Sequence, residues 1–469
     1  MDIPFVGGSY QGRSKNINSQ RCINWFPTAD KEGGKREVSL LNTPGLTEYH
    51  DFSVAAPVRA LRVMGDNLYA VVGATLYELT PAKAQDGKGE LSSSEGQVFM
   101  ADNGNQIVMA DRLRGYLYEG GGEDFVKNIA DVSSGFPGAS SVTFQDGYFI
   151  ASRPDTAQFW ISSLNDGTSW SATDYATAEG KPDSLKSAFS FNHDLWLHGD
   201  KTTEVWYNSG NADFPFSRMG KGVLEVGIGA AASIAQSDEA LFWFDDTRQA
   251  RMAVGYNSRV ISPPQLNYQF STYVKVDDAA GYVFTIEGYT FYVLTFPTAD
   301  KTWMYCQDTN FWNEWSSYPK SGRHRSNCYA YFDGKHIVGD FENGKLYELD
   351  LDVYADDGND IIRTRTTSSI NQDRKRLFFY SLEVEFESGV GLQSGQGSDP
   401  QAMLQWSNDG GHTWSNEVWA DIGKVGRYKN RAIWRRLGSG RDYIFQLRVS
   451  DPVKAVVIGA NAEVELGQT

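Results

Sequence analysis

The sequence predicts an all-β protein whose main part is a β-propeller of about seven blades. One pattern of short strands and polar turns recurs through the middle of the 469-residue chain. The composition agrees, because 47 glycines and 13% aromatic residues suit short strands joined by tight turns. No segment shows a helical periodicity of any length. We therefore expect a propeller with additional β segments at both ends.

The repeat runs from Val58 to about Asp350. Each copy has an alternating strand, a turn rich in Asp, Asn and Gly, an aromatic-rich strand, a second turn, and a strand that ends in Leu-Tyr or Trp. The strands after the first turn begin at Leu68, Ile107, Tyr148, Leu195, Leu241, Phe291 and His336. Their spacing of roughly 40 to 50 residues is the length of one propeller blade. The pattern allows roughly six to eight blades, with about seven favoured.

The turns and the aromatic strands have physical roles in such a fold. Tight hairpins need residues that accept a positive φ, which explains the Asp-Gly and Asn-Gly turns. Wide aromatic side chains pack blade against blade, so Trp196, Trp243 and Tyr292 are interpreted as core residues rather than a binding platform. A closed propeller also has to join its first blade to its last. We expect residues 46–52, LTEYHDF, to supply the missing outer strand of the seventh blade.

The segments outside the repeat complete the predicted domain organisation. Residues 1–50 read as an extended, Gly- and Asn-rich arm of the kind that docks on a neighbour, residues 51–358 as the propeller, and residues 359–469 as a C-terminal β-sandwich. The last segment has longer alternating strands, such as LFFYSLEVEFE and DYIFQLRVS, separated by polar loops. This pattern is typical of a sandwich.

Charge and composition limit the classes of function. The formal net charge is −16 and the pI is near 4.9, which disfavours general binding to nucleic acid or anionic membrane. We expect a soluble protein, because the chain has neither a secretory signal nor about 20 consecutive apolar residues. Cys22, Cys306 and Cys328 are interpreted as buried free thiols. We predict no cofactor, no metal site and no membrane insertion.

One motif matches a known hairpin structure and also occurs in some glycosidases. Ser407, Asp409, Gly411 and Trp414 in SNDGGHTW fit the Asp-box pattern S-x-D-x-G-x-x-W, and SLNDGTSW at residues 163–170 is a degenerate relative. In this device the Asp accepts hydrogen bonds from turn amides and the Trp packs beneath. A glycosidase would also need two carboxylates flanking a pocket, or a Tyr nucleophile with an arginine cluster, and neither can be assembled. We therefore predict no catalytic residues.

A run of cations makes the C-terminal domain basic within an acidic chain. Its members are Arg427, Lys429, Arg431, Arg435, Arg436 and Arg441, with residues 373–376 (DRKR) upstream. A protein interface with acidic neighbours is the favoured interpretation, ahead of a solvated face and of contact with DNA. These six residues form the predicted assembly interface.

Both ends of the chain resemble one family. The run PFVGGSYQGRSKNINSQRCINWFP, followed by LLNTPGL, is similar to the opening of the tail nozzle or hub proteins of short-tailed bacteriophages, also called packaged-DNA stabilisation proteins. The stretches LFFYSLEVEFESGVG, LQWSNDGGHTWSNE and IGKVGRYKNRAIWRRLGSGRDYIFQLRVSDPVKAVVIGA resemble the end of the same family, in the same order. With the propeller between them, the resemblance covers essentially the whole chain.

This resemblance implies a structural, non-enzymatic protein of the virion tail, assembled in the host bacterial cytoplasm. It implies a homo-hexameric ring beneath the adaptor and portal complex that continues the channel for double-stranded DNA without binding it specifically. It further implies a tail needle or other distal plug, with tailspikes or tail fibres nearby. Because a ring needs two different patches on each subunit, we expect reversal of Arg431 and Arg435 to Glu to weaken assembly and leave monomer melting nearly unchanged.

The alternative is a glycan-binding or glycan-cleaving propeller, which the Asp-box pattern and the aromatic content would suit. Such a protein should expose an aromatic pocket with convergent polar groups at the propeller mouth. A nozzle should instead associate with portal and adaptor rings.

Overall fold

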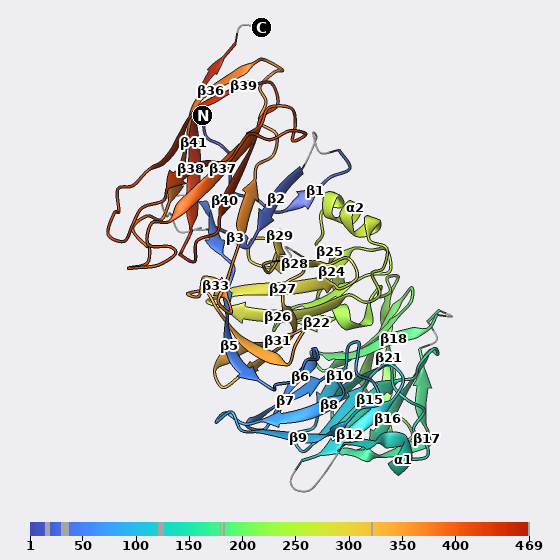
Figure 1. The fold of residues 1–469 in the computed structure, drawn as a ribbon. Coiled ribbons are helices and arrows are strands. Elements are labelled where there is room, and N and C mark those ends of the chain that lie inside the picture. The colour runs from blue at the N-terminus through green and yellow to red at the C-terminus, as the bar shows by residue number, and fades with distance from the viewer. Residues whose placement is uncertain are drawn as a thin grey trace.

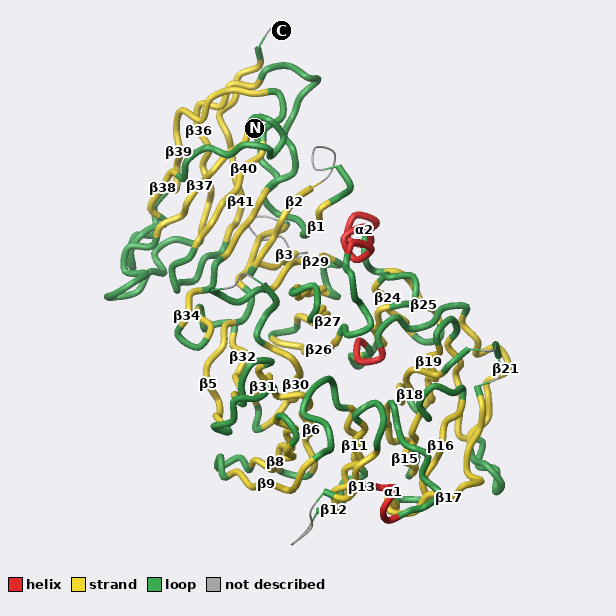
Figure 2. Tube along the Cα trace, turned by 45° about the vertical axis from the view of Figure 1, so that its right-hand side comes forward, coloured by secondary structure: helices red, strands yellow, loops and turns green. Residues whose placement is uncertain are grey.

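The computed structural model contains seven antiparallel sheets arranged around a common axis, with a β-sandwich beside them (Figures 1 and 2). It describes residues 1–14, 19–29, 37–120, 126–178, 180–181, 183–319 and 322–467, apart from the side chain of residue 221. The all-β prediction is confirmed, and the repeat corresponds to seven blades of four strands each. We number the blades 1 to 7 in chain order from β6.

The first four blades each consist of four consecutive strands. Blade 1 comprises β6 (Val58–Met64), β7 (Asn67–Val72), β8 (Thr75–Leu79) and β9 (Gln85–Glu90), and blade 2 comprises β10 (Phe99–Asp102), β11 (Gln106–Ala110), β12 (Gly115–Glu119) and β13 (Lys127–Asn128). Blade 3 comprises β14 (Ser141–Gln145), β15 (Tyr148–Ser152), β16 (Gln158–Ser163) and β17 (Asp166–Thr177), and blade 4 comprises β18 (Leu185–Phe191), β19 (Asp194–Gly199), β20 (Thr203–Asn208) and β21 (Phe216–Leu224).

The last three blades follow the same plan, with one strand taken from the N-terminal segment. Blade 5 comprises β22 (Ala235–Gln236), β23 (Leu241–Phe244), β24 (Ala250–Val254) and β25 (Asn257–Val260), and blade 6 comprises β26 (Ala280–Ile286), β27 (Tyr289–Phe296), β28 (Lys301–Cys306) and β29 (Phe311–Trp315). Blade 7 comprises β30 (Ser326–Phe332), β31 (Lys335–Asp340), β32 (Lys345–Asp350) and β5 (Gly45–Asp51).

The ring closes through β5. This strand pairs antiparallel with β32, from Leu349 opposite Leu46 to Lys345 opposite Asp51. The expectation that residues 46–52 complete the seventh blade is thereby confirmed. The short strands β33 (Ala355–Asp356) and β34 (Asn359–Asp360) extend the same sheet beyond β5. Closure leaves no open gap between the first and last blades, which protects their edges.

The turn between the first two strands of most blades has the backbone that the sequence predicted. Both central residues have positive φ in four blades: Asp146-Gly147, Asn192-His193, Glu287-Gly288 and Asp333-Gly334. Such turns match the right-handed twist of the strands they connect. All of these turns lie on one face of the propeller, because they join the same two strands in every blade; we call it the first-turn face.

Apolar side chains fill every junction between neighbouring blades. Seven buried clusters each combine residues of two adjacent blades, and one of them joins Val58 and Leu68 of blade 1 to Ile337 and Leu346 of blade 7. The interpretation of Trp196, Trp243 and Tyr292 as core is confirmed, since these rings are 1%, 0% and 0% exposed. The propeller is therefore held together by packing between its blades.

The C-terminal domain is a sandwich of two sheets, as predicted. One sheet has the order β3-β4-β41-β36-β39, and the strands β35, β40, β37 and β38 form the other side. A single buried cluster, which includes Leu382, Trp434 and Phe445, lies between them. The strands are β3 (Trp25–Ala29), β4 (Val38–Asn42), β35 (Arg363–Thr366), β36 (Leu377–Phe386), β37 (Gln401–Ser407), β38 (Val418–Asp421), β39 (Ala432–Gly440), β40 (Ile444–Val449) and β41 (Val457–Leu466).

Strands from the first 50 residues join both domains rather than extending away from them. Strand β2 (Ser19–Ile23) pairs with β29 of blade 6 on one side and with β35 of the sandwich on the other. One continuous sheet therefore runs β26-β27-β28-β29-β2-β35-β40-β37-β38, with β1 (Tyr10–Gln11) attached to β2. The N-terminal segment thus forms the structural connection between propeller and sandwich.

The structure also contains short helices that the sequence pattern did not predict. Helix α2 (Pro264–Thr272) buries only Leu266 and Phe270, which is too short a periodic signal to detect. Helix α1 (Ile129–Val132) and a 3-10 turn at Ala231–Ser233 are shorter still. In the described part of the chain, no helix is long and apolar enough to cross a membrane.

Candidate assembly surface

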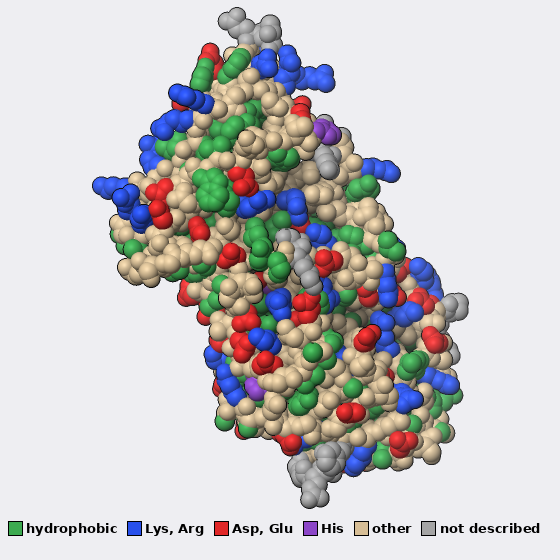
Figure 3. Space-filling view, in the orientation of Figure 1, with side chains coloured by type: hydrophobic (Ala, Val, Ile, Leu, Met, Phe, Trp, Pro, Cys, Tyr) green, Lys and Arg blue, Asp and Glu red, His purple; other side chains and the backbone are tan. Residues whose placement is uncertain are grey.

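The six predicted interface cations follow one edge of the sandwich. Strand β39 is the outermost strand of its sheet and contains Arg435 and Arg436, while Arg427, Lys429 and Arg431 precede it and Arg441 follows it. All six are exposed. Lys and Arg side chains are visible along the outer margin of the sandwich in Figure 3. We call these six residues the basic edge.

The basic edge is only partly neutralised within the subunit. Arg431 forms a bidentate ion pair with Glu383, with Nε donating to Oε1 at 2.7 Å, and Arg441 donates from Nε to the carbonyl oxygen of Arg374. The other four members have no ion-pair partner among the described residues. They are Arg427, Lys429, Arg435 and Arg436. The structure thus leaves four cations free to pair with an external acidic surface.

The Asp-box residues form a local turn in the hairpin between β37 and β38. Asp409 accepts hydrogen bonds from the backbone N–H groups of His412 and Thr413 and from the Thr413 hydroxyl. These bonds lower the pKa of Asp409 well below its usual value. Ser407 Oγ accepts the N–H of Gly411, and Trp414 is still 36% exposed. The Asp409 carboxylate is therefore satisfied by hydrogen bonds within its own turn. This turn belongs to the sandwich and not to the propeller.

A buried polar network at β2 was not found from the sequence. Glu314, which is 5% exposed, accepts two hydrogen bonds from Arg21, at 3.0 and 2.8 Å, and one from Ser9. Burial raises the pKa of Glu314, but the interactions with Arg21 and Lys301 together outweigh this effect. The pKa of Glu314 is therefore lower than its usual value. Arg365, fully buried, donates to the carbonyl oxygens of Phe5 and Gly8. Both arginines lie in short strands that are largely polar, SQRCI and RTRT, so no apolar pattern marks them as buried.

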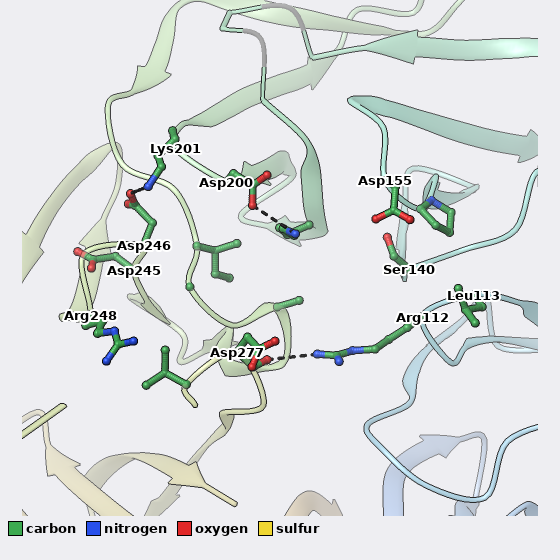
Figure 4. Close-up of a pocket in the computed structure, with 16 residues that line it drawn as sticks. Arg112, Leu113, Ser140, Asp155, Asp200, Lys201, Asp245, Asp246, Arg248 and Asp277 are labelled. Carbon is green, nitrogen blue, oxygen red and sulfur yellow. Dashed lines mark hydrogen bonds and ion pairs between the residues drawn. The ribbon is translucent and has the colours of Figure 1, made fainter. Parts of the chain in front are cut away.

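The propeller has a cavity at each mouth of its axis. The one opposite the first-turn face has a volume of about 730 Å³, and none of the described residues that line it is aromatic. Figure 4 shows that Lys201 pairs with Asp246 at 2.9 Å, that Lys186 pairs with Asp200 at 3.3 Å, and that Arg112 donates a hydrogen bond to the backbone carbonyl oxygen of Asp277. A saccharide site normally offers an aromatic platform with convergent polar groups, so this cavity does not favour the glycan alternative.

The cavity on the first-turn face has a volume of about 620 Å³ and lies among the turns of blades 3, 4 and 5. Asp146 and Asp238 line it, together with Gln145 and His193. Gln145 donates from Nε2 to the carbonyl oxygen of His193 at 2.6 Å. Its Oε1 atom is buried and has no hydrogen-bond partner in the described part of the chain. This cavity is therefore acidic and retains an unused acceptor.

The described residues contain no group of three His, Cys, Asp or Glu side chains that could hold a metal ion. All three cysteines are free, with Cys22 and Cys306 buried and Cys328 half-buried. Burial raises the pKa of the Cys22 thiol to about 12, which makes it a poor nucleophile.

Comparison with known families identifies two adjoining matches. Residues 1–354 match the family model described as bacteriophage P22 Gp10, β-propeller. Residues 362–465 match the model described as bacteriophage P22 Gp10, β-sandwich. No curated protein sequence matches the chain.

Solved propeller structures are similar at low sequence identity. The WD40 β-propeller domain of Doa1 is 12% identical, with 66% of this chain and 97% of that chain covered and a TM-score of 0.42. BamB from Moraxella catarrhalis is 8% identical, with 71% of this chain and 98% of that chain covered and a TM-score of 0.39.

Proposed function

The chain belongs to the family of bacteriophage P22 Gp10, and from this premise we propose that this phage tail protein forms a homo-hexameric nozzle ring. The ring sits below the portal and adaptor and continues the DNA channel. It helps to retain packaged DNA and then lets it pass during ejection. Assembly takes place in the host bacterial cytoplasm, before or during attachment to the head.

The observation that carries the proposal is the order and extent of the two family matches. They follow one another over residues 1–354 and 362–465, and so include the N-terminal segment, the propeller and the sandwich. Propellers alone serve many unrelated functions. The combination of a propeller with this sandwich, joined by strand β2, is the more specific feature.

The charges of the chain are compatible with a DNA conduit. With a net charge of −16, the protein as a whole repels phosphate, so DNA can pass without being held. A distal plug such as a tail needle closes the channel, and tailspikes or tail fibres attach around the ring. We propose a structural role without catalysis, because Asp409 and the paired charges at the propeller mouth are all occupied by structural partners.

Electron microscopy of the purified chain, alone and mixed with its portal and adaptor complex, tests the proposal. We expect a six-fold ring at the distal end of the adaptor, with a central channel continuous with that of the portal. A chain that does not associate with the adaptor, or that attaches as isolated monomers, would contradict the proposed function.

The basic edge gives this experiment a surface variant. Arg435→Glu is a cleaner change than Arg431→Glu, because Arg431 already pairs with Glu383 and its reversal would place two carboxylates side by side. We expect Arg435→Glu to reduce ring formation in native mass spectra while the melting temperature stays nearly constant. An intact ring would exclude this part of the basic edge from the interface.

A further inference from the structure

The first-turn face of the propeller carries an unbalanced set of carboxylates. Five of the seven turns on this face contribute exposed acidic side chains, which are Asp66, Asp146, Asp238, Glu239, Glu287 and Asp333. None of them forms an ion pair among the described residues. At the opposite mouth, by contrast, Lys186 and Lys201 are both paired with carboxylates. The two faces therefore differ in charge.

Turn geometry explains part of this set, because Asp-Gly suits a turn with positive φ, as at Asp146 and Asp333. Asn192 adopts the same positive φ in blade 4 without a charge, and Gly104 does so in blade 2. Glu287 has φ 49°, although Glu is not among the residues that favour this conformation. A neutral residue such as Asn fits the same turn, so the geometry does not require six carboxylates on this face.

The 620 Å³ cavity is a recess in this acidic face. Gln145 is only 4% exposed, lines the cavity, and has a buried Oε1 atom to which none of the described residues donates a hydrogen bond. A buried acceptor without a partner costs free energy. Asp146 and Asp238 lie on the same lining. The lining thus offers two carboxylates, which suit an Arg or Lys side chain, beside the buried amide oxygen of Gln145.

The sandwich presents a segment with matching chemistry. The loop at residues 422–431, between β38 and β39, carries the unpaired Arg427 and Lys429 on either side of Tyr428, which is 74% exposed. Backbone hydrogen bonds from Gly426 to Gly389 and from Arg427 to Lys424 fix its shape. The loop is therefore ordered before it binds, which lowers the entropic cost of docking.

Within one subunit, the loop and the cavity lie on different parts of the molecule. The sandwich continues the sheet of blade 6 through β2 and sits beside blades 6 and 7, whereas the cavity lies among the turns of blades 3 to 5 (Figure 2). A ring needs two different surfaces on each subunit that complement each other. The acidic mouth and the basic loop are two such surfaces.

We propose that the loop at residues 422–431 of one subunit docks into the acidic cavity of the next, with Arg427 and Lys429 facing Asp146, Asp238 and Gln145. This inference rests on the proposed ring. It defines which surfaces form the contact between neighbouring subunits. The cavity is large enough for several side chains, since binding sites of about 300–1,000 Å³ accept drug-sized ligands.

Charge reversal on the two surfaces tests the inference. The mouth variant carries Asp146→Lys and Asp238→Lys, and the loop variant carries Arg427→Glu and Lys429→Glu. We expect each variant alone to lose ring formation by more than about tenfold in native mass spectra, because like charges then meet at every contact. An equal mixture should form rings again, with the two variants alternating around an even-numbered ring.

A matched control separates charge from backbone strain. Asp155 lies in the same blade as Asp146, on the opposite face, with φ 55° against 50°, so Asp155→Lys imposes similar strain. This control should form rings normally. If wild-type rings form and both reversed variants also form them, or if the mixture is not restored, the inference is wrong while the proposed function stands. If the wild-type chain forms no ring with its adaptor, the proposed function fails and this inference with it.

Discussion

His324 shows how the packing of one residue determines a pH response. It is fully buried, its ring stacks on Trp315 with centroids 3.7 Å apart, and Nδ1 lies 2.7 Å from the Ser326 hydroxyl. Burial, with a smaller contribution from Arg325, lowers the pKa of His324 to about 3. In the unfolded chain the same group titrates near pH 6.5, so protons bind preferentially to the unfolded state.

The stability that neutral His324 contributes is therefore present above about pH 6.5 and is lost progressively as the pH falls toward about 3. Each such histidine should add about 1.4 kcal/mol per pH unit to the acid destabilisation. His324→Gln removes this share, so its stability deficit relative to wild type should shrink between pH 6 and pH 4. Urea unfolding at several pH values measures the difference. A deficit that is constant with pH would show that His324 has the same pKa in the folded and unfolded states.

For single residues, the sequence predicted buried apolar positions better than buried polar ones. Trp196, Trp243 and Tyr292 were assigned to the core because they recur at one position of successive blades. The bond between Arg21 and Glu314 joins residues 293 positions apart. No local pattern reports such a pair, because their proximity depends on the complete fold. For the same reason the cavity beside Gln145 could not be predicted.

Strand β5 is the element on which closure of the propeller depends. Leu46, 1% exposed, packs in the cluster between blades 6 and 7 with Trp315, Val338 and Tyr347. Leu46→Ala should cost about 2–5 kcal/mol and loosen β5 from β32. Hydrogen exchange should then rise in β5, β32 and the adjoining β6 of blade 1.

Leu404→Ala provides the matched control, because Leu404 is equally buried but lies in the core of the sandwich. It should raise exchange in β37 and β40 and leave blade 7 protected. Equal exchange in blade 7 for both variants would show that β5 is not the local closure element.

Strand β5 could be predicted from the sequence, because a closed ring with three strands in its last blade requires a fourth. Strand β2 could not, because its single-residue register with β29 leaves no repeat in the sequence.

The whole molecule is organised as one body because a continuous sheet passes from blade 6 into the sandwich through β2. The predicted boundaries at residues 50 and 358 follow changes in sequence pattern, whereas the strands of the first 50 residues are shared between both domains. A domain boundary is visible in sequence where a repeat stops. A shared strand is not visible, because its partners are distant in the chain.

This shared sheet predicts that propeller and sandwich unfold together, with Glu314 as a main point of coupling. Glu314→Gln keeps the side-chain volume but removes the charge that faces Arg21 and Lys301. We expect a loss of about 2 kcal/mol, below the roughly 3–5 kcal/mol of a fully buried pair, because Arg21 is 35% exposed. Calorimetry should show one unfolding transition for the wild type and two for the variant.

Asp245→Asn in blade 5 is the control. It weakens the buried ion pair between Asp245 and Arg251, which lies away from the junction. This variant should have a lower melting temperature but still a single transition. If both variants retain a single transition, the coupling is carried by the packing around β2 rather than by its ion pair.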